Sequence, residues 1–395
     1  MPTRRVLSLS TLYPNPARPR FGNFVARSLE ALVAGGEWEV TVINPIGVPP
    51  IAFGPYREAA ASAVDGMEHG VQVYRPTFTL IPKLGGRLNP GAIARAVLPL
   101  AKRLHAERPF DLLDAQFFYP DGPAVAMIAR ELRLPFSIKA RGADIHHWGH
   151  VPYAGRMMRG AADKAAGLLS VCDALAADMA AIGLPRGKIA IHYTGLDRDR
   201  FRPLQSPNLR PRLSEVLGIP LRHDDKLLVT LGALVPRKGQ ELVIRSLPQL
   251  PAVRLLLVGE GEDKARLQAL AAELGVAERV HFLGLLDHDL LPLVLSAADT
   301  MVLPSASEGL ANAWVEALAC GTPLVISDAG GAREVVTSRA AGAIVERTTQ
   351  AITHGIETLL SNPPARADTA AMAERFDWKV NGAQLAEYYS GLAKR

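Results

Sequence analysis

Short apolar runs alternate with longer amphipathic stretches along most of the chain. Apolar runs flanked by helical patterns are typical of parallel strands with helices on both faces of the sheet, so the pattern predicts an α/β fold. The expected strands are 6–9, 40–43, 71–74, 112–115, 136–138, 168–171, 189–192, 227–231, 254–258, 280–283, 301–303, 324–326 and 343–345. The clearest expected helices of the first half are 22–33, 91–107, 120–132 and 173–182.

The most informative stretch runs from Ser305 to Gly331. An apolar run ends at Pro304, a polar turn follows, and an Ala/Leu-rich stretch then continues to Gly321. This order predicts strand, turn and helix, with the glycine as the helix stop. Ligands of doubly wound sheets gather where strands end and helices begin, because free backbone N–H groups point there.

Two carboxylates mark this stretch, Glu308 at the expected helix start and Glu316 farther along. Helix geometry would leave them ~80° apart around the axis and ~12 Å apart along it. That distance is too long for one shared metal or proton, but it suits two contacts on one long ligand. The alternative is that Glu308 only complements the helix dipole and Glu316 is solvated.

The stretch resembles the EX7E donor-binding signature of the family 4 retaining glycosyltransferases, which have the GT-B fold. The matched residues are Glu308, Gly309, Asn312, Glu316, Ala317, Gly321, Pro323, Gly330, Gly331 and Glu334. The resemblance implies two Rossmann-like parallel-sheet domains facing a central cleft, with the last helix crossing back to the first domain. The expected domains are residues 1–200, completed by 376–395, and residues 201–375.

The same resemblance assigns the donor site to the second domain. Glu308 would hold the donor sugar together with the backbone of Gly309, Leu310 and Ala311, and Glu316 would bind the ribose. Lys238 and Arg237, at a helix start, would neutralise the pyrophosphate; relatives usually carry a further arginine at the position of Ala233, and Arg237 is its nearest substitute here. The turn at Gly259 and the segment at Leu285 would line the nucleotide side.

The acceptor side is implied in the first domain. Gly22 and Asn23 end a proline-rich loop before an expected helix, and Arg141, Asp144 and His146 follow an expected strand. Many relatives have a histidine at the position of Arg141. Either Arg141 takes over that contact, or His146 or its neighbour His147 does. Because an arginine is always charged, it can stabilise an anion but cannot act as a base.

Charge is distributed unevenly between the two halves. Residues 1–210 carry 26 Lys+Arg and 17 Asp+Glu, a net of +9, and the remainder carry 18 and 22, a net of −4. A basic first half suggests an acidic partner. With 6% aromatic residues and no nucleic-acid motif, nucleic acid is not expected as that partner.

Residues 81–105 contain no acid and include Lys83, Arg87, Arg95, Lys102 and Arg103 between apolar residues. We take peripheral contact with an anionic membrane as a hypothesis for this segment, with a solvated basic face as the alternative. Its two prolines, Pro90 and Pro99, are expected to limit helix length. No apolar run is long enough to span a membrane, and the N-terminus is interpreted as a first strand.

The sequence therefore predicts a retaining hexosyltransferase that moves a sugar from a nucleoside-diphosphate sugar to a glycan or lipid-linked acceptor, in cell-envelope or exopolysaccharide biosynthesis. No cofactor and no metal are expected, and two cysteines without metal or disulfide spacing fit a cytoplasmic location. The alternatives are an epimerase or hydrolase on the same fold, and a non-catalytic sugar-nucleotide-binding protein. A nicotinamide dehydrogenase is disfavoured because Gly259-Glu260-Gly261 does not continue to the third glycine of that fingerprint.

Overall fold

The computed structural model describes residues 3–82, 85–222 and 224–394. Lys83 of the basic segment lies outside the described residues. The chain forms two compact units, residues 1–195 with 378–395, and residues 196–377. The chain thus passes between the units twice, after residue 195 and after residue 377.

The first unit contains an eight-stranded sheet with the order β10-β9-β8-β7-β1-β2-β5-β4. Its strands are β1 (Arg4–Leu9), β2 (Trp38–Ile43), β4 (Gly66–Glu68), β5 (Val71–Tyr74), β7 (Leu112–Ala115), β8 (Phe136–Lys139), β9 (Gly167–Ser170) and β10 (Ile189–Ile191). All neighbours pair in parallel except β4 with β5. Strands β3 (Ile46–Val48) and β6 (Thr77–Thr79) form a separate parallel pair.

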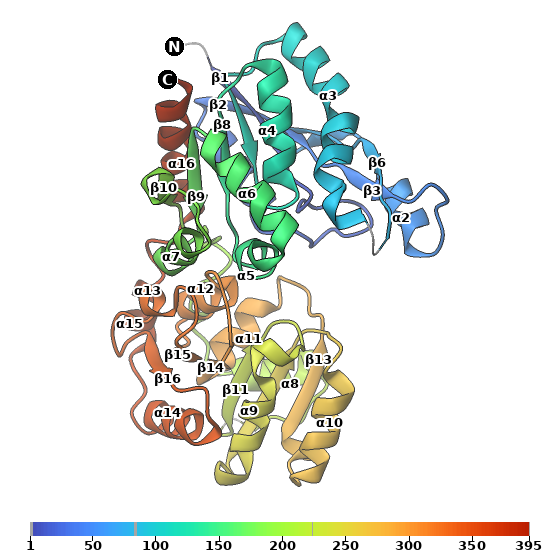
Figure 1. Ribbon diagram of the computed structural model, residues 1–395. Helices are drawn as coiled ribbons and strands as arrows, with labels where there is room; N and C mark the ends of the chain where they lie inside the picture. The colour runs from blue at the N-terminus through green and yellow to red at the C-terminus, as the bar shows by residue number, and fades with distance from the viewer. Residues whose placement is uncertain (1–2, 83–84, 223, 395) are drawn as a thin grey trace. The chain divides into compact units, whose positions relative to one another are not determined.

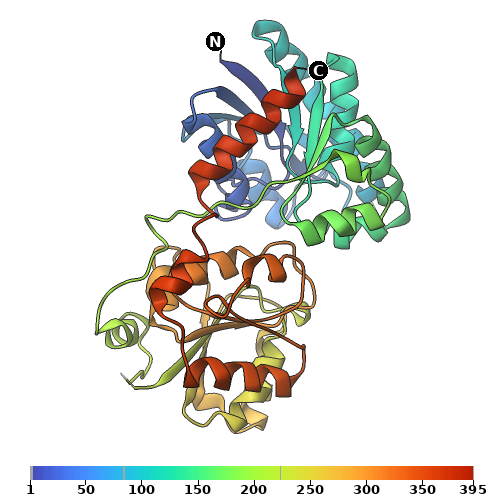
Figure 2. The same cartoon turned by 90° about the vertical axis from the view of Figure 1, so that its left-hand side faces the viewer.

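Helices cover both faces of this sheet. They are α1 (Asn23–Ala34), α2 (Pro55–Ala61), α3 (Asn89–Glu107), α4 (Asp121–Leu132), α5 (Ala143–His146), α6 (Pro152–Lys164), α7 (Asp173–Ala181) and α16 (Trp378–Ala393). Helices α3, α4 and α6 lie side by side (Figure 1), and α16 lies against α1 (Figure 2). From β1 the chain adds strands on one side of the sheet, and from β7 it adds them on the other. Because both sets of crossovers are right-handed, the helices of the two sets lie on opposite faces of the sheet.

Burial on both faces explains why the central strands are apolar along their whole length. Every residue of β7, β8 and β9 is buried. The core beneath α1 and α16 is closed by large side chains, with the ring of Tyr389 edge-on to that of Trp38 at 5.6 Å. Such aromatic pairs bury large areas and add specificity to the packing. The last helix is therefore part of the first unit's core.

The second unit contains a six-stranded parallel sheet with the order β13-β12-β11-β14-β15-β16. Its strands are β11 (Lys226–Leu231), β12 (Val253–Val258), β13 (Val280–Gly284), β14 (Thr300–Leu303), β15 (Leu324–Ser327) and β16 (Gly342–Val345). Its helices are α8 (Leu209–Leu217), α9 (Gln240–Ser246), α10 (Lys264–Glu273), α11 (Leu291–Ala297), α12 (Asn312–Ala319), α13 (Ala332–Val335), α14 (Thr349–Ser361) and α15 (Arg366–Ala371). The prediction of two parallel-sheet α/β units, with the last helix in the first, is confirmed.

The expectation that proline limits the basic segment was wrong. Helix α3 runs through Pro99, which is exposed, whereas Pro90 occupies the first helical turn. A proline in the first turn costs little because its missing N–H has no partner there, and on the solvent side water can satisfy the carbonyl that Pro99 leaves unpaired. None of the helices within the described residues is long and apolar enough to cross a bilayer.

We predict that Gly382→Ala destabilises the first unit although the helix propensity of alanine is higher. A Cβ at Gly382 would lie 2.4 Å from the Ala31 carbonyl oxygen of α1, whereas a Cβ at Gly391, on the same helix, would meet nothing within 4 Å. Forcing α1 and α16 apart should cost about 1–3 kcal/mol, partly offset by about 1 kcal/mol of propensity.

Urea unfolding followed by tryptophan fluorescence measures this difference. Gly391→Ala is the control and should be neutral or stabilising, by up to about 1 kcal/mol. Equal effects of the two substitutions would contradict the close packing of α16 on α1.

Candidate active site

The second sheet has a topological switch point between β11 and β14. These strands are neighbours, but the chain continues from β11 toward β12 and from β14 toward β15, on opposite sides. The loops that follow the two strands therefore diverge and leave room at the carboxyl edge of the sheet, where ligands of such folds bind. The first loop carries Arg237 and Lys238, and the second carries Glu308.

Lys238 and Glu308 form an ion pair at this point. The Lys238 Nζ donates to Glu308 Oε1, and the Arg237 guanidinium lies 3.7 Å from Glu308 Oε2. The Lys238 and Glu308 side chains are 11% and 9% exposed, whereas that of Arg237 is 51% exposed. Two cations therefore share one carboxylate, and the group carries a net positive charge at a partly buried position.

Backbone contacts fix the two loops against each other. The Ala306 N–H donates to the Arg237 carbonyl at 2.6 Å, and the Arg237 guanidinium donates to the Ser307 carbonyl at 3.1 Å. Gly239 has φ 75° and caps α9, and a Cβ there would lie 2.4 Å from the Pro304 carbonyl. Only glycine combines this backbone conformation with so close an approach. The charged side chains are thus held by a rigid backbone.

Glu308 itself lies before the helix. Helix α12 begins at Asn312, with Ala311 as its N-cap, so the helical spacing assumed between Glu308 and Glu316 does not apply. The loop 308–311 is supported from the start of α13, where the Gly331 N–H donates to the Gly309 carbonyl at 2.8 Å. This correction separates the roles of the two glutamates further, since only Glu316 belongs to the helix.

Glu316 has a different partner. Its Oε1 lies 3.6 Å from His288 Nε2, and its side chain is 14% exposed. The other ring nitrogen of His288 lies 2.8 Å from an Arg200 guanidinium nitrogen. Glu316 is therefore neither solvated nor in the Lys238 cluster, but is oriented by a chain of polar contacts. Sequence reasoning missed His288, for which no motif gave a signal.

The remaining predicted donor residues lie at neighbouring strand ends. Gly259 follows β12, and its N–H donates to the carbonyl of Gly284, the last residue of β13. Leu285 comes next and its side chain is 70% exposed. The strand ends of β11, β12 and β13 thus form a continuous edge, with an exposed apolar side chain at Leu285.

The first unit has its own switch point, between β1 and β7. Thr11, after β1, donates from its N–H and its hydroxyl to the Asp121 carboxylate at 3.0 and 2.8 Å. Asp121 begins α4 and is fully buried, and this burial raises its pKa to about 7. Sequence reasoning missed the contact between Thr11 and Asp121, because it depends on the order of the strands in the sheet.

Arg141 joins the elements around this switch point. Its guanidinium donates to the backbone and side-chain oxygens of Gln116 at 3.2 and 2.5 Å, and lies 5.1 Å from the ring centre of Phe24. Phe24 belongs to α1, whose N-cap is Gly22 and whose first residue is Asn23. Three of the predicted acceptor residues therefore gather at the start of α1.

Asp144 and His146 are engaged differently. The Asp144 carboxylate is buried and accepts N–H groups of Phe118, Arg141 and Gly142 at 2.9, 3.0 and 2.9 Å, and burial raises its pKa. Asp144 therefore orders the loop that carries Arg141. His146 Nε2 lies 2.9 Å from Asp178 Oδ2 of α7, with both side chains partly exposed.

A buried polar network beside these residues was not predicted. Lys139 Nζ lies 2.5 Å from His192 Nδ1, and His192 Nε2 donates to the Asn381 carbonyl of α16 at 2.9 Å. Burial lowers the pKa values of both Lys139 and His192. A lysine at the end of an apolar strand was the available signal. Among the residues that the structure describes, no three His, Cys, Asp or Glu side chains could hold a metal ion together.

Two parallel-sheet α/β units, one with a cation–carboxylate cluster at its switch point, form the arrangement expected of a GT-B glycosyltransferase. The family model "Glycosyl transferases group 1" matches residues 217–376, and "Glycosyl transferase 4-like domain" matches residues 22–195. The chain belongs to the family 4 type of glycosyltransferases.

Individual relatives agree with this assignment. A GDP-mannose-dependent alpha-(1-6)-phosphatidylinositol monomannoside mannosyltransferase from Mycolicibacterium smegmatis is 38% identical over 215 residues, which are 50% of this chain and 55% of that protein. The alignment thus spans about half of that relative. The putative teichuronic acid biosynthesis glycosyltransferase TuaC of Bacillus subtilis is 27% identical over 89% of this chain and 88% of its own.

The fold has solved counterparts. Anabaena HepE, crystallised in complex with UDP, superposes with a TM-score of 0.75 at 22% identity, over 98% of this chain and 100% of the other. At this level of identity the similarity establishes the fold alone, and the fold prediction is confirmed.

We predict that Asp121 makes stability fall as pH rises. Because the carboxyl has a pKa of about 7 in the folded protein and 3.8 as the ordinary value, the folded state binds the proton more tightly. Its stabilising contribution is complete below the ordinary pKa and is lost as pH rises to about 7, by up to about 4 kcal/mol.

Urea unfolding of the wild-type protein and of Asp121→Asn, at pH 5 and pH 8, measures this contribution. The neutral amide should reduce the loss of stability between the two pH values. Asp163→Asn, at an exposed position of α6, is the control and should leave the pH dependence unchanged. The same pH dependence in Asp121→Asn would show that Asp121 is not its source.

Proposed function

We propose that the protein is a retaining glycosyltransferase that moves a sugar from a nucleoside-diphosphate sugar to a glycan or lipid-linked acceptor of the cell envelope. The observation that carries the proposal is the contact of Lys238 with Glu308 at the switch point of the second sheet. Residues 70 positions apart meet where such sheets bind nucleotides, with a charge that suits a diphosphate. The M. smegmatis and B. subtilis relatives support the donor class and the cell-envelope acceptor by their names.

The residue roles follow from the charges. Without ligand, the Glu308 carboxylate compensates Lys238 and Arg237. A bound diphosphate would form the ion pairs with these two cations in place of Glu308. The Glu308 carboxylate would then accept hydrogen bonds from hydroxyl groups of the donor sugar. As the bond between the sugar and the diphosphate breaks, negative charge grows on the leaving group, and the preorganised cations stabilise it. Glu316, oriented by His288, would accept hydrogen bonds from the ribose hydroxyls. Gly259 and Leu285 would lie beside the nucleotide base.

The first unit would hold the acceptor. Arg141 presents a permanent positive charge beside Gly22 and Asn23, which suits a phosphate-bearing acceptor. Asp144 acts through the loop it orders, because its carboxylate is occupied by backbone N–H groups. His146 is tied to Asp178, so it would contribute a hydrogen bond to the acceptor only if that pair opens.

We predict that Lys238→Met weakens nucleoside-diphosphate binding about tenfold, because a hydrogen bond to a charged group contributes 1.5–3 kcal/mol. Glu308→Gln should lower kcat about a hundredfold, the size expected for one electrostatic group of a transition state. Lys226→Met is the control, since Lys226 is exposed at the opposite end of β11. Calorimetry with UDP, GDP, ADP and dTDP, and mass analysis of products formed from the corresponding sugars, provide the measurements.

The acceptor decides between this function and the alternatives. Sugar transfer that requires an acceptor supports a glycosyltransferase, and inversion of the anomeric centre would exclude the retaining mechanism. Donor consumption without any acceptor would indicate an epimerase or hydrolase. A non-catalytic binding protein would bind a nucleotide sugar tightly and show no turnover with any acceptor tested. Its binding affinity would be the same in Glu308→Gln.

We also infer that a peripheral membrane contact, if the acceptor is lipid-linked, is made around α2 rather than by α3. The apolar face of α3, including Ile93, Val97 and Leu104, is buried in the first unit and is unable to contact lipid. By contrast Ile51 and Phe53, just before α2, are 80% and 56% exposed. Exposed apolar side chains beside a basic residue such as Arg57 suit an anionic lipid surface.

The prediction is that the double substitution Ile51→Ser and Phe53→Ser weakens binding to phosphatidylglycerol vesicles by about tenfold or more, since burying one such side chain contributes 1.5–3 kcal/mol. Val216→Ser, at a 47% exposed position of α8, is the matched control. Vesicle co-sedimentation measures the effect. If the double variant Arg95→Gln, Arg103→Gln lost vesicle binding and the Ile51→Ser, Phe53→Ser variant did not, the membrane contact would be assigned to α3 instead.

A further inference from the structure

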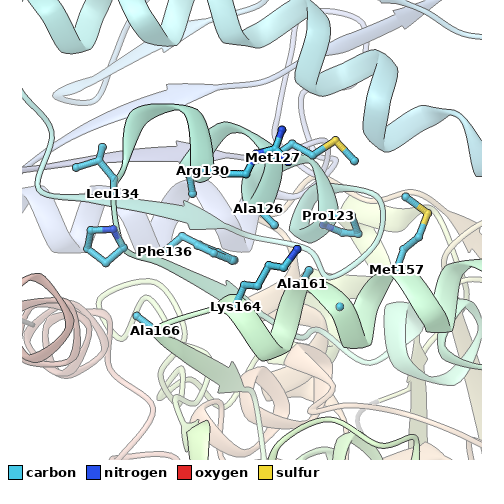
Figure 3. Close-up of a pocket in the computed structure, with 13 residues that line it drawn as sticks. Pro123, Ala126, Met127, Arg130, Leu134, Phe136, Met157, Ala161, Lys164 and Ala166 are labelled. Carbon is cyan, nitrogen blue, oxygen red and sulfur yellow. The ribbon is translucent and has the colours of Figure 1, made fainter.

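A cavity of about 720 Å³ opens between α4 and α6 of the first unit. The residues that line this cavity are drawn in Figure 3; they come from both helices and from the segments around the starts of β8 and β9. Small residues on the facing helices, Ala126 and Ala129 on α4 and Gly160 and Ala161 on α6, leave the space open. Cavities of this size are in the range that holds small ligands.

The cavity lies away from the proposed acceptor residues. Its floor includes Phe136, the first residue of β8, and Ala166, just before β9. Arg141 follows the other end of β8. In parallel sheets the substrate site lies at the carboxyl ends of the strands, so a cavity at their amino ends is a separate feature.

The charged groups of the lining lie at one end of the cavity. Helices α4 and α6 run in the same direction, because each leads to the next parallel strand of the sheet. Arg130 and Lys164 both belong to the last turns of their helices, whereas Met127 and Met157 lie one or two turns earlier. From Met157 to Lys164 the groove extends about 10 Å along the helix axis.

The two cations are available to a ligand. Within the described residues, the Lys164 amine has no ion pair, and Figure 3 shows it extending into the space between the helices. The carbonyls at the end of α6 are instead satisfied by Lys188, whose Nζ lies 2.7 Å from the Asp163 oxygen and 2.9 Å from that of Ala165. The one ion pair of Arg130 with another described residue is an exposed contact of 3.6 Å with Glu131, which contributes little.

The shape of the groove limits what can enter it. A helix with its side chains is about 10–12 Å wide, and an unbranched alkyl chain is much narrower, so such a chain can lie deep in the groove between two packed helices. Methionine side chains, here Met127 and Met157, are flexible and polarizable and adapt to such a chain.

We propose that the groove between α4 and α6 binds the alkyl chain of a single-chain anionic amphiphile of the fatty-acid class, with its carboxylate at Arg130 and Lys164. The small residues accommodate the chain, the methionines cover it, and the two cations hold the head group. The site is independent of the donor and acceptor residues.

Laurate is the probe, titrated into the full chain by calorimetry. Gly160→Leu should weaken binding about tenfold or more, because excluding one or two methylenes from an apolar pocket already has this effect. A Cβ at Gly160 would meet nothing within 4 Å, so this variant keeps the fold while its side chain fills the groove. Gly391→Leu is the matched control, an equally open glycine on α16.

Lys164→Gln tests the head-group end and should weaken laurate binding about threefold, as expected for an exposed ion pair. Arg95→Gln, an exposed cation on α3, should have no effect. Dodecyltrimethylammonium, with the same chain and the opposite charge, should bind more weakly than laurate.

Several results would overturn the proposal. These are the absence of saturable laurate binding, equal binding by the Gly160→Leu and Gly391→Leu variants, and a preference for the cationic amphiphile. A dimer in solution that Gly160→Leu converts to a monomer would assign the groove to a second copy of the chain instead.

Discussion

The adjacency of β11 and β14 is the constraint on which the proposed donor site depends. These two strands are neighbours in space although three helices and two further strands separate them in sequence. The strands that follow them in the chain, β12 and β15, lie on opposite sides of this pair. The loops after β11 and β14 therefore diverge, and Lys238 contacts Glu308 in the space between them. Desolvation makes an unpaired buried charge costly, so each residue needs the other in the empty site. In the function proposed above, a diphosphate would compensate both cations, because it carries one negative charge on each phosphate. The ion pair therefore keeps the empty site charged and ordered.

The two units apply the same topology to different chemistry. In the second, the switch point holds the nearly buried Lys238–Glu308 pair beside the exposed Arg237, and the net positive charge suits the binding of a small anion. In the first, Thr11 and Asp121 close the equivalent point by a buried hydrogen bond, and Arg141 is presented above it by Gln116 and Phe24. Asp144 satisfies backbone donors that the loop would otherwise leave unpaired in the interior. The first unit thus uses buried polar groups to order its loops, while in the second such groups are themselves the proposed binding groups.

The apolar runs predicted the main strands because strands covered on both faces must be apolar throughout, as in β7 and β15. Motifs located Lys238 and Glu308, since their positions after strands follow from local sequence. Other features were beyond sequence reasoning because they depend on contacts between distant segments: His288 beside Glu316, Thr11 on Asp121, and Lys139 against His192. Short elements such as α2 and β3 also escaped prediction, because three to seven residues carry too little periodicity.

The double passage of the chain between the units has a consequence for biosynthesis. Helix α16 supplies Tyr389 to the core beneath Trp38, yet it is translated after the whole second unit. The second unit is therefore complete before the first can acquire this helix. Until α16 has been made, the face of α1 that receives it stays open to solvent, including the surface around Leu29 and Leu32. The first unit thus begins earlier and completes its core later than the second, and its exposed apolar face is open to aggregation during that interval.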